Sequence, residues 1–439
     1  MNHVFHRHTK IDLATVAAGD GPYIIDDKGK RYLDASGGAA VSCLGHNNTE
    51  VIGAIKAQLD RIPWAHSSFF TNEPMETLAD ILCERAPGNL DRVYFVSGGS
   101  EAVEAALKLA RQYFLERGET QRRLFVSRRQ SYHGNTLGAL SVGGNQWRRA
   151  QFRPLLMESH HIAPCYPYRD RSDDESLEQY GLRVANELEE KLAEVGAENV
   201  IAFIAEPVVG ATAGALVPAP GYFKRIREIC DEHGILLILD EVMCGVGRTG
   251  TLFACEQDGV SGDLVAIAKG LAAGYQPIGA LLVSSEIYDA VRNGSGFFQH
   301  GHTFMGHPTA CAAAVSTLEI IERDNLLANV MNRGRELMAA LGQQFGDHPH
   351  VGDIRGRGLF IGVELVKDRA TREPFDPSNP LHAKIKSKAL ENGLMCYPMS
   401  GTIDGQRGHH ILLAPPYIID SGHVAEIVDK LATSVNAVI

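Results

Sequence analysis

Five short apolar runs, each ending abruptly in polar residues, set the pattern of residues 90–285. Runs of this length without polar alternation predict strands that are buried on both faces, as in a parallel sheet. Glycines, acidic residues and a lysine follow these runs, and functional sites use residues of these types. The runs are Arg92–Val96, Leu124–Val126, Ile201–Ala205, Ile235–Leu239 and Leu264–Ala268.

Amphipathic stretches lie between these runs and predict helices. Glu101–Arg117 places apolar residues on one stripe, and so does Tyr222–His233, which Gly234 follows as a typical helix stop. The alternation of strand and helix predicts an α/β fold with a mostly parallel, doubly wound sheet. In such sheets the site lies at the carboxyl ends of the strands, so we expect the polar residues there to converge.

The pattern changes after about residue 325. Helical stretches there surround two short predicted strands, Leu359–Glu364 and Ile411–Ala414. Near the other end of the chain, Pro22–Leu33 has the pattern of a hairpin that turns at Asp26-Asp27-Lys28-Gly29. We therefore expect a large domain over residues 61–325 and a smaller α/β domain formed from both chain ends. In the smaller domain, residues 1–60 are expected to pack against residues 326–439.

Composition and charge exclude several classes of protein. Apolar residues make up 44% of the chain and charged residues 22%, which are globular values and exclude disordered and fibrous classes. The 42 basic residues against 53 acidic ones give a net charge of −11, which disfavours binding to nucleic acid or an anionic membrane. No apolar run approaches the roughly 18 residues of a membrane span, and the N-terminus lacks the apolar core of a signal peptide.

The eight cysteines are scattered and form no CxxC pair. This spacing disfavours disulfide frameworks and zinc sites and favours a reducing compartment. The histidines also lack a metal-binding spacing, so no metal is expected. These features together predict a soluble, cytoplasmic protein.

Lys269 and Asp240 each end an apolar run. A lysine there usually extends to solvent, but in a desolvated site it can form a Schiff base. A buried carboxylate must be paired or strongly hydrogen-bonded, and a structural salt bridge or a metal ligand is the alternative interpretation. About 30 residues, one strand–connection–strand unit, separate the two, so both can face one cleft. Pyridoxal phosphate needs such a pair, because the lysine holds its aldehyde and the carboxylate keeps its pyridine nitrogen protonated.

Ser97-Gly98-Gly99-Ser100 lies between a predicted strand and a predicted helix and could hold the phosphate of that cofactor. Its glycines free backbone N–H groups, Ser100 adds a hydroxyl, and the helix N-terminus adds its dipole. An ordinary turn with Ser100 as the helix N-cap is an equally good interpretation. Glu101 and Glu104 in the first turn would have to point away from a bound phosphate.

A cofactor ring also needs partners on its two faces. Tyr132, in Tyr132-His133-Gly134, is a candidate for stacking on one face, and Val242 is a candidate for the other. Core packing is the alternative interpretation for each.

A second glycine string, Gly245-Val246-Gly247-Arg248-Thr249-Gly250, matches the dinucleotide pattern G-x-G-x-x-G. Residues 240–244 separate this string from the preceding apolar run, and the sequence after it is too broken for the helix that the pattern requires. A nicotinamide-binding site is therefore not expected.

Taken together, these strings resemble the class III aminotransferases, the ornithine/ω-amino-acid family of fold-type-I pyridoxal-phosphate enzymes. They occur in the family's order and approximate spacing, and weaker likeness extends to both chain ends, through Gly356-Arg357-Gly358-Leu359-Phe360 and Ala414-Pro415-Pro416. The second glycine string is also a feature of the family. The matching strings are Ser97-Gly98-Gly99-Ser100-Glu101-Ala102, Tyr132-His133-Gly134, Glu206-Pro207, Asp240-Glu241-Val242 with Gly245–Gly250, Ala268-Lys269-Gly270, His302-Thr303-Phe304 and Gly306-His307-Pro308.

The resemblance implies a role for each matching position. Lys269 is the expected Schiff-base lysine and proton carrier, and Asp240 is the expected partner of the pyridinium nitrogen. Thr303 is expected to reach the phosphate of the neighbouring subunit, which implies a homodimer with shared active sites. The other expected cofactor contacts are Gly99 and Ser100 at the phosphate, Tyr132 and Val242 on the ring faces, and Glu206 near the ring and the substrate pocket.

Two positions depart from the family pattern. Met243-Cys244 stands where many members have Gln-Thr, which alters the edge of the site. Ser97-Gly98-Gly99-Ser100 stands where many members have Asn-Ser-Gly-Ser, which leaves open by one position which N–H groups reach the phosphate.

The activity implied by the resemblance is ping-pong transfer of an amino group from an amine or ω-amino acid to a keto acid such as pyruvate or 2-oxoglutarate. Arg407 is a candidate for binding the keto acid's carboxylate, with an exposed loop arginine as the alternative. Trp64 and Phe69 are candidates for the wall of the amine pocket, or for core packing. The alternative functions are an aminomutase, racemase or decarboxylase on the same fold, a nicotinamide dehydrogenase, and a binding protein without activity.

Overall fold

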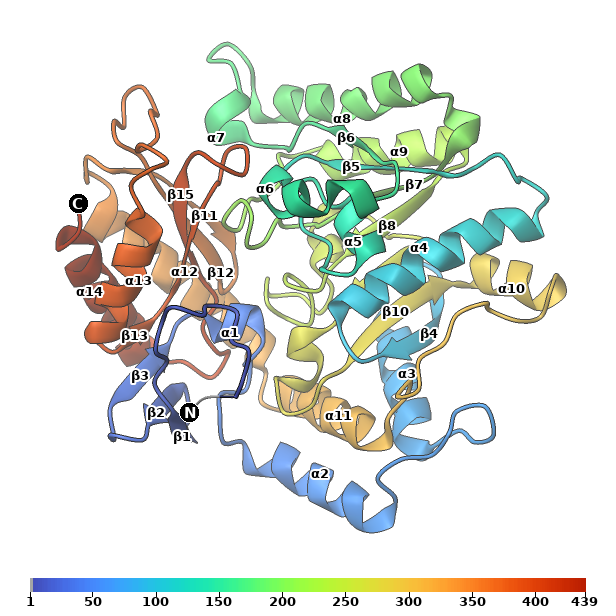
Figure 1. The fold of residues 1–439 in the computed structure, drawn as a ribbon, viewed down its shortest axis with the longest axis horizontal. Coiled ribbons are helices and arrows are strands. Elements are labelled where there is room, and N and C mark those ends of the chain that lie inside the picture. The colour runs from blue at the N-terminus through green and yellow to red at the C-terminus, as the bar shows by residue number, and fades with distance from the viewer. Residues whose placement is uncertain (1–2) are drawn as a thin grey trace.

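The computed structural model describes residues 3–439, and its largest sheet has seven strands in the order β4-β10-β9-β8-β7-β5-β6 (Figure 1). Residues 1 and 2 lie outside the described residues; they belong to the N-terminal stretch for which the sequence predicts no signal peptide. Strand β10 runs against both of its neighbours, and every other pair is parallel. All five predicted strands are present. The bounds are β4 Leu90–Val96, β5 Leu124–Arg128, β6 His160–Ile162, β7 Val200–Ala205, β8 Leu236–Asp240, β9 Leu264–Ile267 and β10 Gly279–Ser284.

Helices cover both faces of this sheet, as the continuous apolar strands require. On one face, Ile238 of β8 belongs to the apolar cluster of α4 (Gly99–Glu116). Its neighbour Leu237 points to the other face, where α8 (Leu177–Val195) and α9 (Tyr222–His233) pack. The predicted doubly wound α/β arrangement is therefore confirmed.

One helix begins earlier than predicted. Helix α9 has the predicted bounds and ends at Gly234 with a φ of 58°. Helix α4 starts at Gly99 rather than Glu101, and its N-cap is Gly98. Ser100 therefore lies inside the first turn, and the interpretation of Ser100 as the N-cap is wrong.

Both chain ends contribute to a second, smaller region. Its four-stranded antiparallel sheet has the order β11-β12-β15-β14. A third sheet, β1-β2-β3-β13, contains the predicted hairpin as β2 and β3, and β3 pairs in parallel with β13 from the C-terminal part. Figure 1 shows the blue hairpin beside the orange and red helices. The bounds are β1 Val16–Asp20, β2 Tyr23–Asp26, β3 Arg31–Asp34, β11 Val351–Arg357, β12 Phe360–Leu365, β13 Leu394–Met395, β14 Tyr397–Ser400 and β15 His409–Leu413.

This pairing places the N-terminal hairpin with the C-terminal region, as expected from the sequence. The division into 1–60, 61–325 and 326–439 stays a prediction, although helix α12 begins at the last of these boundaries. Within residues 3–439, no helix combines the length and apolar character needed to cross a membrane. The remaining helices are α1 Gly37–Ala40, α2 Thr49–Arg61, α3 Glu73–Arg85, α5 Leu137–Val142, α6 Gln146–Arg149, α7 Pro167–Asp170, α10 Ser285–Asn293, α11 Pro308–Arg323, α12 Leu326–Phe345, α13 Leu381–Glu391 and α14 Ser421–Asn436.

Candidate active site

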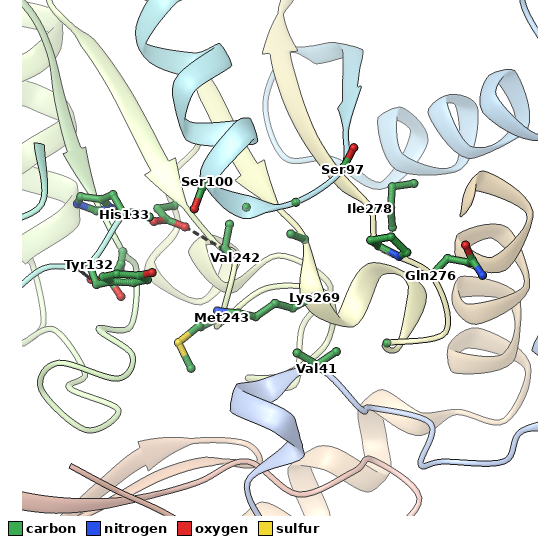
Figure 2. A pocket seen from close by; sticks show the side chains of 18 residues that line it. Val41, Ser97, Ser100, Tyr132, His133, Val242, Met243, Lys269, Gln276 and Ile278 are labelled. Atoms are coloured by element: carbon green, nitrogen blue, oxygen red, sulfur yellow. Dashed lines mark hydrogen bonds and ion pairs between the residues drawn. The ribbon is translucent and has the colours of Figure 1, made fainter. Parts of the chain in front are cut away.

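A cavity of about 450 Å³ opens at the carboxyl ends of the central strands (Figure 2). The polar residues that follow all five predicted strands line it. The helix α4 N-terminus, the segment before α5 and the turn before β10 complete the wall. The predicted site residues that line the cavity are Gly99, Ser100, Tyr132, Glu206, Asp240, Val242 and Lys269.

Lys269 lies one residue beyond Ala268, which follows the end of β9, and it reaches into this cavity (Figure 2). Its backbone has a φ of 50°, in the left-handed region that lysine rarely adopts, so the surrounding fold holds it there. Desolvation lowers the pKa of Lys269 to about 8, against the opposing charges of Asp240 and Glu206. A lysine with such a pKa has a substantial neutral fraction near neutral pH and can act as a nucleophile.

Asp240 is the last residue of β8, and both of its carboxylate oxygens are engaged. Its Oδ2 lies 2.8 Å from Nδ1 of His133, and its Oδ1 accepts from the backbone N–H of Val242 at 3.1 Å. Asp240 and His133 are both buried. The carboxylate is therefore fixed in one orientation beside the cavity.

His133 is a site residue to which the sequence analysis gave no role. Its other ring nitrogen, Nε2, is buried without a hydrogen-bond partner among the described residues. The motif Tyr132-His133-Gly134 contained the signal, but an isolated histidine in a motif does not reveal which carboxylate it meets. Its partner Asp240 lies 107 positions further along the chain.

Glu206 is buried and holds the backbone on which Tyr132 stands. Its carboxylate accepts from the N–H of Tyr132 at 3.0 Å and from the N–H of Gly210 at 2.9 Å. Burial raises the pKa of Glu206; the charge of Asp240 adds to the rise and His133 opposes it. The position of Tyr132 at the cavity wall thus depends on Glu206.

At the other end of the cavity, Gly99 allows the start of α4 to pack closely against Val242. A Cβ atom on Gly99 would lie 2.6 Å from Cγ1 of Val242, so only glycine lets that side chain pack there. A Cβ atom on Gly98 would instead meet open space. Ser100 Oγ accepts from the N–H of Asn135 at 3.0 Å. The N-terminus of α4 therefore borders open space in the cavity.

The acidic residues of the first turn of α4 are fixed by other partners. Glu101 accepts from the N–H of Ser97 at 2.7 Å, and Glu104 accepts from the N–H of Ala139 at 3.0 Å. Both carboxylates are thus bound to backbone N–H groups.

The remaining predicted residues lie outside the lining of this cavity. The indole N–H of Trp64 donates to the carbonyl of Thr303 at 3.3 Å, so these two meet at the surface. Phe69 is 78% exposed, and its ring is tilted at 56° to that of His66, with the ring centroids 5.5 Å apart. Arg407 lies in an exposed loop, where its Nε is 2.6 Å from Oδ2 of Asp404. Their expected roles stay predictions.

The residues around the cavity fit pyridoxal phosphate. The cavity offers an amine of lowered pKa for the aldehyde, a fixed carboxylate for the ring nitrogen, and a helix N-terminus for the phosphate. Val242 and Tyr132 add an aliphatic and an aromatic wall. Within the described chain, no cluster of three or more potential ligands could hold a metal ion.

Comparison with known proteins gives consistent matches along nearly the whole chain. The family model "Aminotransferase class-III" matches residues 4–435. An uncharacterized aminotransferase of Schizosaccharomyces pombe is 44% identical over 439 residues, which cover all of this chain and 96% of the relative. An (S)-enantioselective omega-transaminase from Thermomicrobium roseum superposes with a TM-score of 0.92 at 35% identity, covering 99% of this chain and 96% of that chain. The omega transaminase from Pseudomonas jessenii in complex with PMP gives 0.93 at 33% identity, covering 100% and 96%.

Proposed function

Because this chain belongs to the class-III aminotransferases, which are pyridoxal-phosphate-dependent enzymes of fold type I, we propose that it transfers an amino group from an amine or ω-amino acid to a keto acid such as pyruvate or 2-oxoglutarate. The proposed mechanism is ping-pong, with one substrate leaving before the other binds. The observation that carries the proposal is the placement of Lys269 and the Asp240–His133 pair in one cavity.

The same cavity is proposed to hold the cofactor. Lys269 would bind its aldehyde, Asp240 would pair with its ring nitrogen, and Gly99 and Ser100 would hold its phosphate. Tyr132 and Val242 would cover its two faces. When bound, the cofactor supplies an electron sink for the bonds of the substrate's reacting carbon.

The chain's own groups account for the proton chemistry that such a transfer needs. The low pKa of Lys269, about 8, lets its amine take and return a proton near neutral pH. Asp240 stays oriented because His133 and the N–H of Val242 hold its two oxygens. Glu206 holds Tyr132 in place through the backbone N–H of Tyr132.

We further propose a homodimer in which Thr303 completes the partner's phosphate site. Thr303 is exposed and lies beside Trp64. Large apolar side chains nearby are also exposed, with Phe69 at 78%, Phe70 at 68% and Phe304 at 57%. Exposed apolar residues gathered in this way indicate an interface. Trp64 and Arg407 are proposed to contact the substrate.

The test is the visible absorption spectrum of the purified protein, before and after borohydride. A visible band that borohydride removes supports the cofactor assignment, provided that the reduced cofactor is then found attached to Lys269. A colourless protein that stays colourless with added pyridoxal phosphate contradicts it. Adding amines and then keto acids tests the activity: bleaching by an amine and recovery of the band only with a keto acid support a transaminase. Turnover without a keto acid indicates an aminomutase, racemase or decarboxylase instead.

A further inference from the structure

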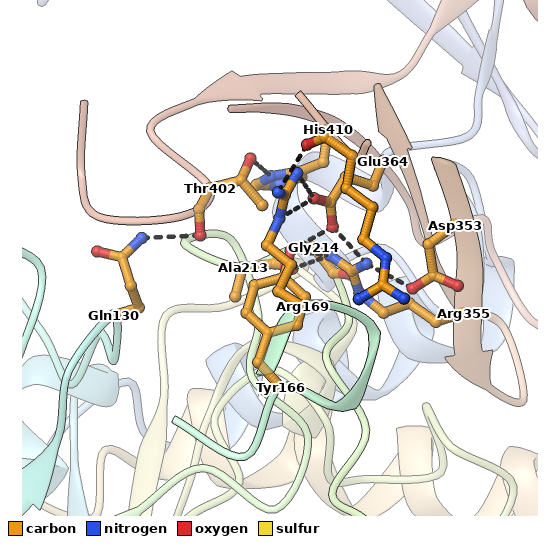
Figure 3. A network of polar contacts seen from close by, with 11 residues as sticks. Gln130, Tyr166, Arg169, Ala213, Gly214, Asp353, Arg355, Glu364, Thr402 and His410 are labelled. Carbon is orange, nitrogen blue, oxygen red and sulfur yellow. Dashed lines mark hydrogen bonds and ion pairs between the residues drawn. The ribbon is translucent and has the colours of Figure 1, made fainter. Parts of the chain in front are cut away.

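A network of buried polar contacts joins the C-terminal region to the segment that carries Tyr132 (Figure 3). At one end lies Gln130, which is 3% exposed. Its amide Nε2 donates to the carbonyls of Gly401 at 2.6 Å and Thr402 at 3.0 Å. Its backbone carbonyl accepts from Oγ1 of Thr212 at 2.5 Å. Gln130 therefore ties together three segments that are far apart in the sequence.

The backbone of Gln130 is itself under constraint. Its φ is 62°, in the left-handed region that glutamine rarely adopts, and such strain persists only where the surroundings fix the conformation. The amide oxygen is also used, because Oε1 accepts from Nδ2 of Asn145 at 3.2 Å. Asn145 in turn caps α6, its Oδ1 accepting from the N–H of Arg148 at 3.2 Å.

One of the segments that Gln130 holds is α6, which carries Arg148. The guanidinium carbon of Arg148 lies 4.5 Å from the centre of the Tyr132 ring and 6.0 Å from that of Trp147. These two rings are the contacts that the structure gives the guanidinium. Its neighbour Arg149 instead donates to backbone carbonyls, including that of Gly143 at 2.7 Å. Among residues 3–439, the N–H donors of Arg148 thus have no hydrogen-bond partner, and they lie beside a residue that lines the cavity.

The other segment is the loop over residues 401–408, which carries Arg407. Asp404 engages its Nε at 2.6 Å, which leaves the two terminal nitrogens for another partner. The loop rests on α6, because a Cβ atom on Gly405 would lie 3.1 Å from the backbone nitrogen of Trp147. One amide side chain therefore positions both arginine-bearing segments relative to Tyr132.

We propose that Gln130 is a positioning residue for substrate recognition, which holds α6 and the 401–408 loop beside Tyr132 as an edge that binds the carboxylate of an amino acid or keto acid. Guanidinium groups recognise carboxylates through paired N–H donors, and the match depends on geometry. The inference rests on the proposed transaminase function.

The test compares two acceptors that differ in the carboxylate, pyruvate and acetaldehyde, in the half-reaction of the aminated holoenzyme. The variant Gln130→Gly removes the amide, and glycine adopts the left-handed conformation without strain. Gln130→Asn keeps an amide and also tolerates this conformation. Asn329→Ala is the matched control, since the Asn329 amide likewise donates to two carbonyls of a neighbouring segment, those of Tyr417 at 2.6 Å and Ile419 at 2.9 Å.

We expect Gln130→Gly to lower kcat/KM for pyruvate by about tenfold or more, mainly through KM, and to change kcat/KM for acetaldehyde by less than about threefold. Gln130→Asn should lose less of the kcat/KM for pyruvate than Gln130→Gly does. Asn329→Ala should leave the ratio of the kcat/KM values for pyruvate and acetaldehyde unchanged. Equal losses for both acceptors, or no loss for pyruvate, would overturn the proposal.

A double-mutant cycle adds a second readout. If the edge is correctly identified, Arg148→Ala or Arg407→Ala lowers kcat/KM for pyruvate without a matching loss for acetaldehyde. Adding Gln130→Gly to either variant should then lower kcat/KM for pyruvate by less than about a further twofold. Full additivity would contradict the proposed coupling. A failure of the proposed function has a different outcome, because the unmodified protein would then transfer no amino group to either acceptor.

Discussion

Nδ1 of His133 lies 2.8 Å from Oδ2 of Asp240, and both side chains are buried at the wall of the cavity. The N–H of Val242 holds the other oxygen of Asp240. The carboxylate proposed to pair with the cofactor's ring nitrogen is thus oriented from two sides. The orientation of this carboxylate therefore depends on His133, which lies more than a hundred positions before β8, in the segment between β5 and α5.

Replacing His133 is expected to slow turnover while leaving the cofactor bound. His133→Ala frees one oxygen of Asp240, and a misplaced carboxylate should lower kcat on the order of 10- to 100-fold. His133→Asn, which can still donate a hydrogen bond, should keep more of the rate. The measurement is kcat together with the absorption maximum of the bound cofactor; an alanine variant with both unchanged would show that His133 has no positioning role.

The amine of Lys269 is expected to react with pyridoxal phosphate faster as the pH rises through about 8. Below its pKa of about 8 the group is an ammonium and cannot attack, and above it the group is neutral. The rate of cofactor binding to the apoprotein, followed by absorbance between pH 6 and 10, should therefore rise with a midpoint near 8. A midpoint near that of an ordinary lysine would contradict the desolvated environment. Lys269→Ala is the control that should form no covalent adduct.

Adding a methyl group at Gly99 is expected to weaken cofactor binding. The Cβ atom of Gly99→Ala would lie 2.6 Å from Cγ1 of Val242, so either the first turn of α4 or the Val242 side chain must move. We expect the dissociation constant of pyridoxal phosphate to rise by about tenfold. The double variant Gly99→Ala/Val242→Ala removes the clash and should recover part of the affinity. If the double variant binds no better than Gly99→Ala, the contact with Val242 is not the cause.

Subunit mixing tests the proposed shared site. If Thr303 serves the partner's phosphate site, Lys269→Ala and Thr303→Ala impair different components of one composite site. A mixed dimer then has one site with both residues intact, so mixed dimers separated from the two parental homodimers should have about half of the activity of wild-type dimers. Size-exclusion chromatography checks that both variants assemble. No recovery in a confirmed mixed dimer would place Thr303 and Lys269 in the same subunit's site.

The buried ion-pair network in Figure 3 is expected to contribute strongly to stability. Glu364, fully buried, pairs with Arg355 at 2.6 Å and with Arg169 at 2.5 Å. Arg355→Met leaves the buried Glu364 carboxylate with one guanidinium, that of Arg169, in place of two, so it should reduce the free energy of unfolding by about 3 kcal/mol.

The control for this prediction is an exposed ion pair. Arg61→Met breaks a pair with Glu73 in which both side chains are about two thirds exposed, at 65% and 69%, and should cost less than about 1 kcal/mol. Urea unfolding of both variants measures the difference. Equal losses would show that burial does not determine the contribution of the Arg355 pair.

Much of the fold and the inner site could be predicted because their signals are local. The strand before Asp240 and the strand before Lys269 are continuous apolar runs, and parallel strands bring their carboxyl ends together whatever the order of the sheet. Burial of both faces explains why these runs lack alternation, and the two separate cores on either side of β8 agree with this.

The rest of the site depends on contacts between distant segments. Nothing in the sequence near His133 specifies that it meets Asp240, and nothing near Gln130 specifies the carbonyls of Gly401 and Thr402, 271 and 272 positions away. The start of α4 at Gly99 also escaped prediction, because glycine is a weak helix former and its presence there reflects the space left by Val242. Such positions are determined by packing rather than by local propensity.

The parallel pairing of β3 with β13 has a consequence for biosynthesis. Lys30 donates to the carbonyl of Glu391, 361 positions further along the chain, and β13 begins shortly after it, at Leu394. On the ribosome the hairpin is made among the first residues and its sheet partner among the last, so one hairpin edge stays unpaired during almost the whole of translation. Exposed strand edges of this kind recruit other chains. We therefore expect C-terminally truncated nascent chains to aggregate and to depend on chaperones that shield the hairpin until synthesis is complete.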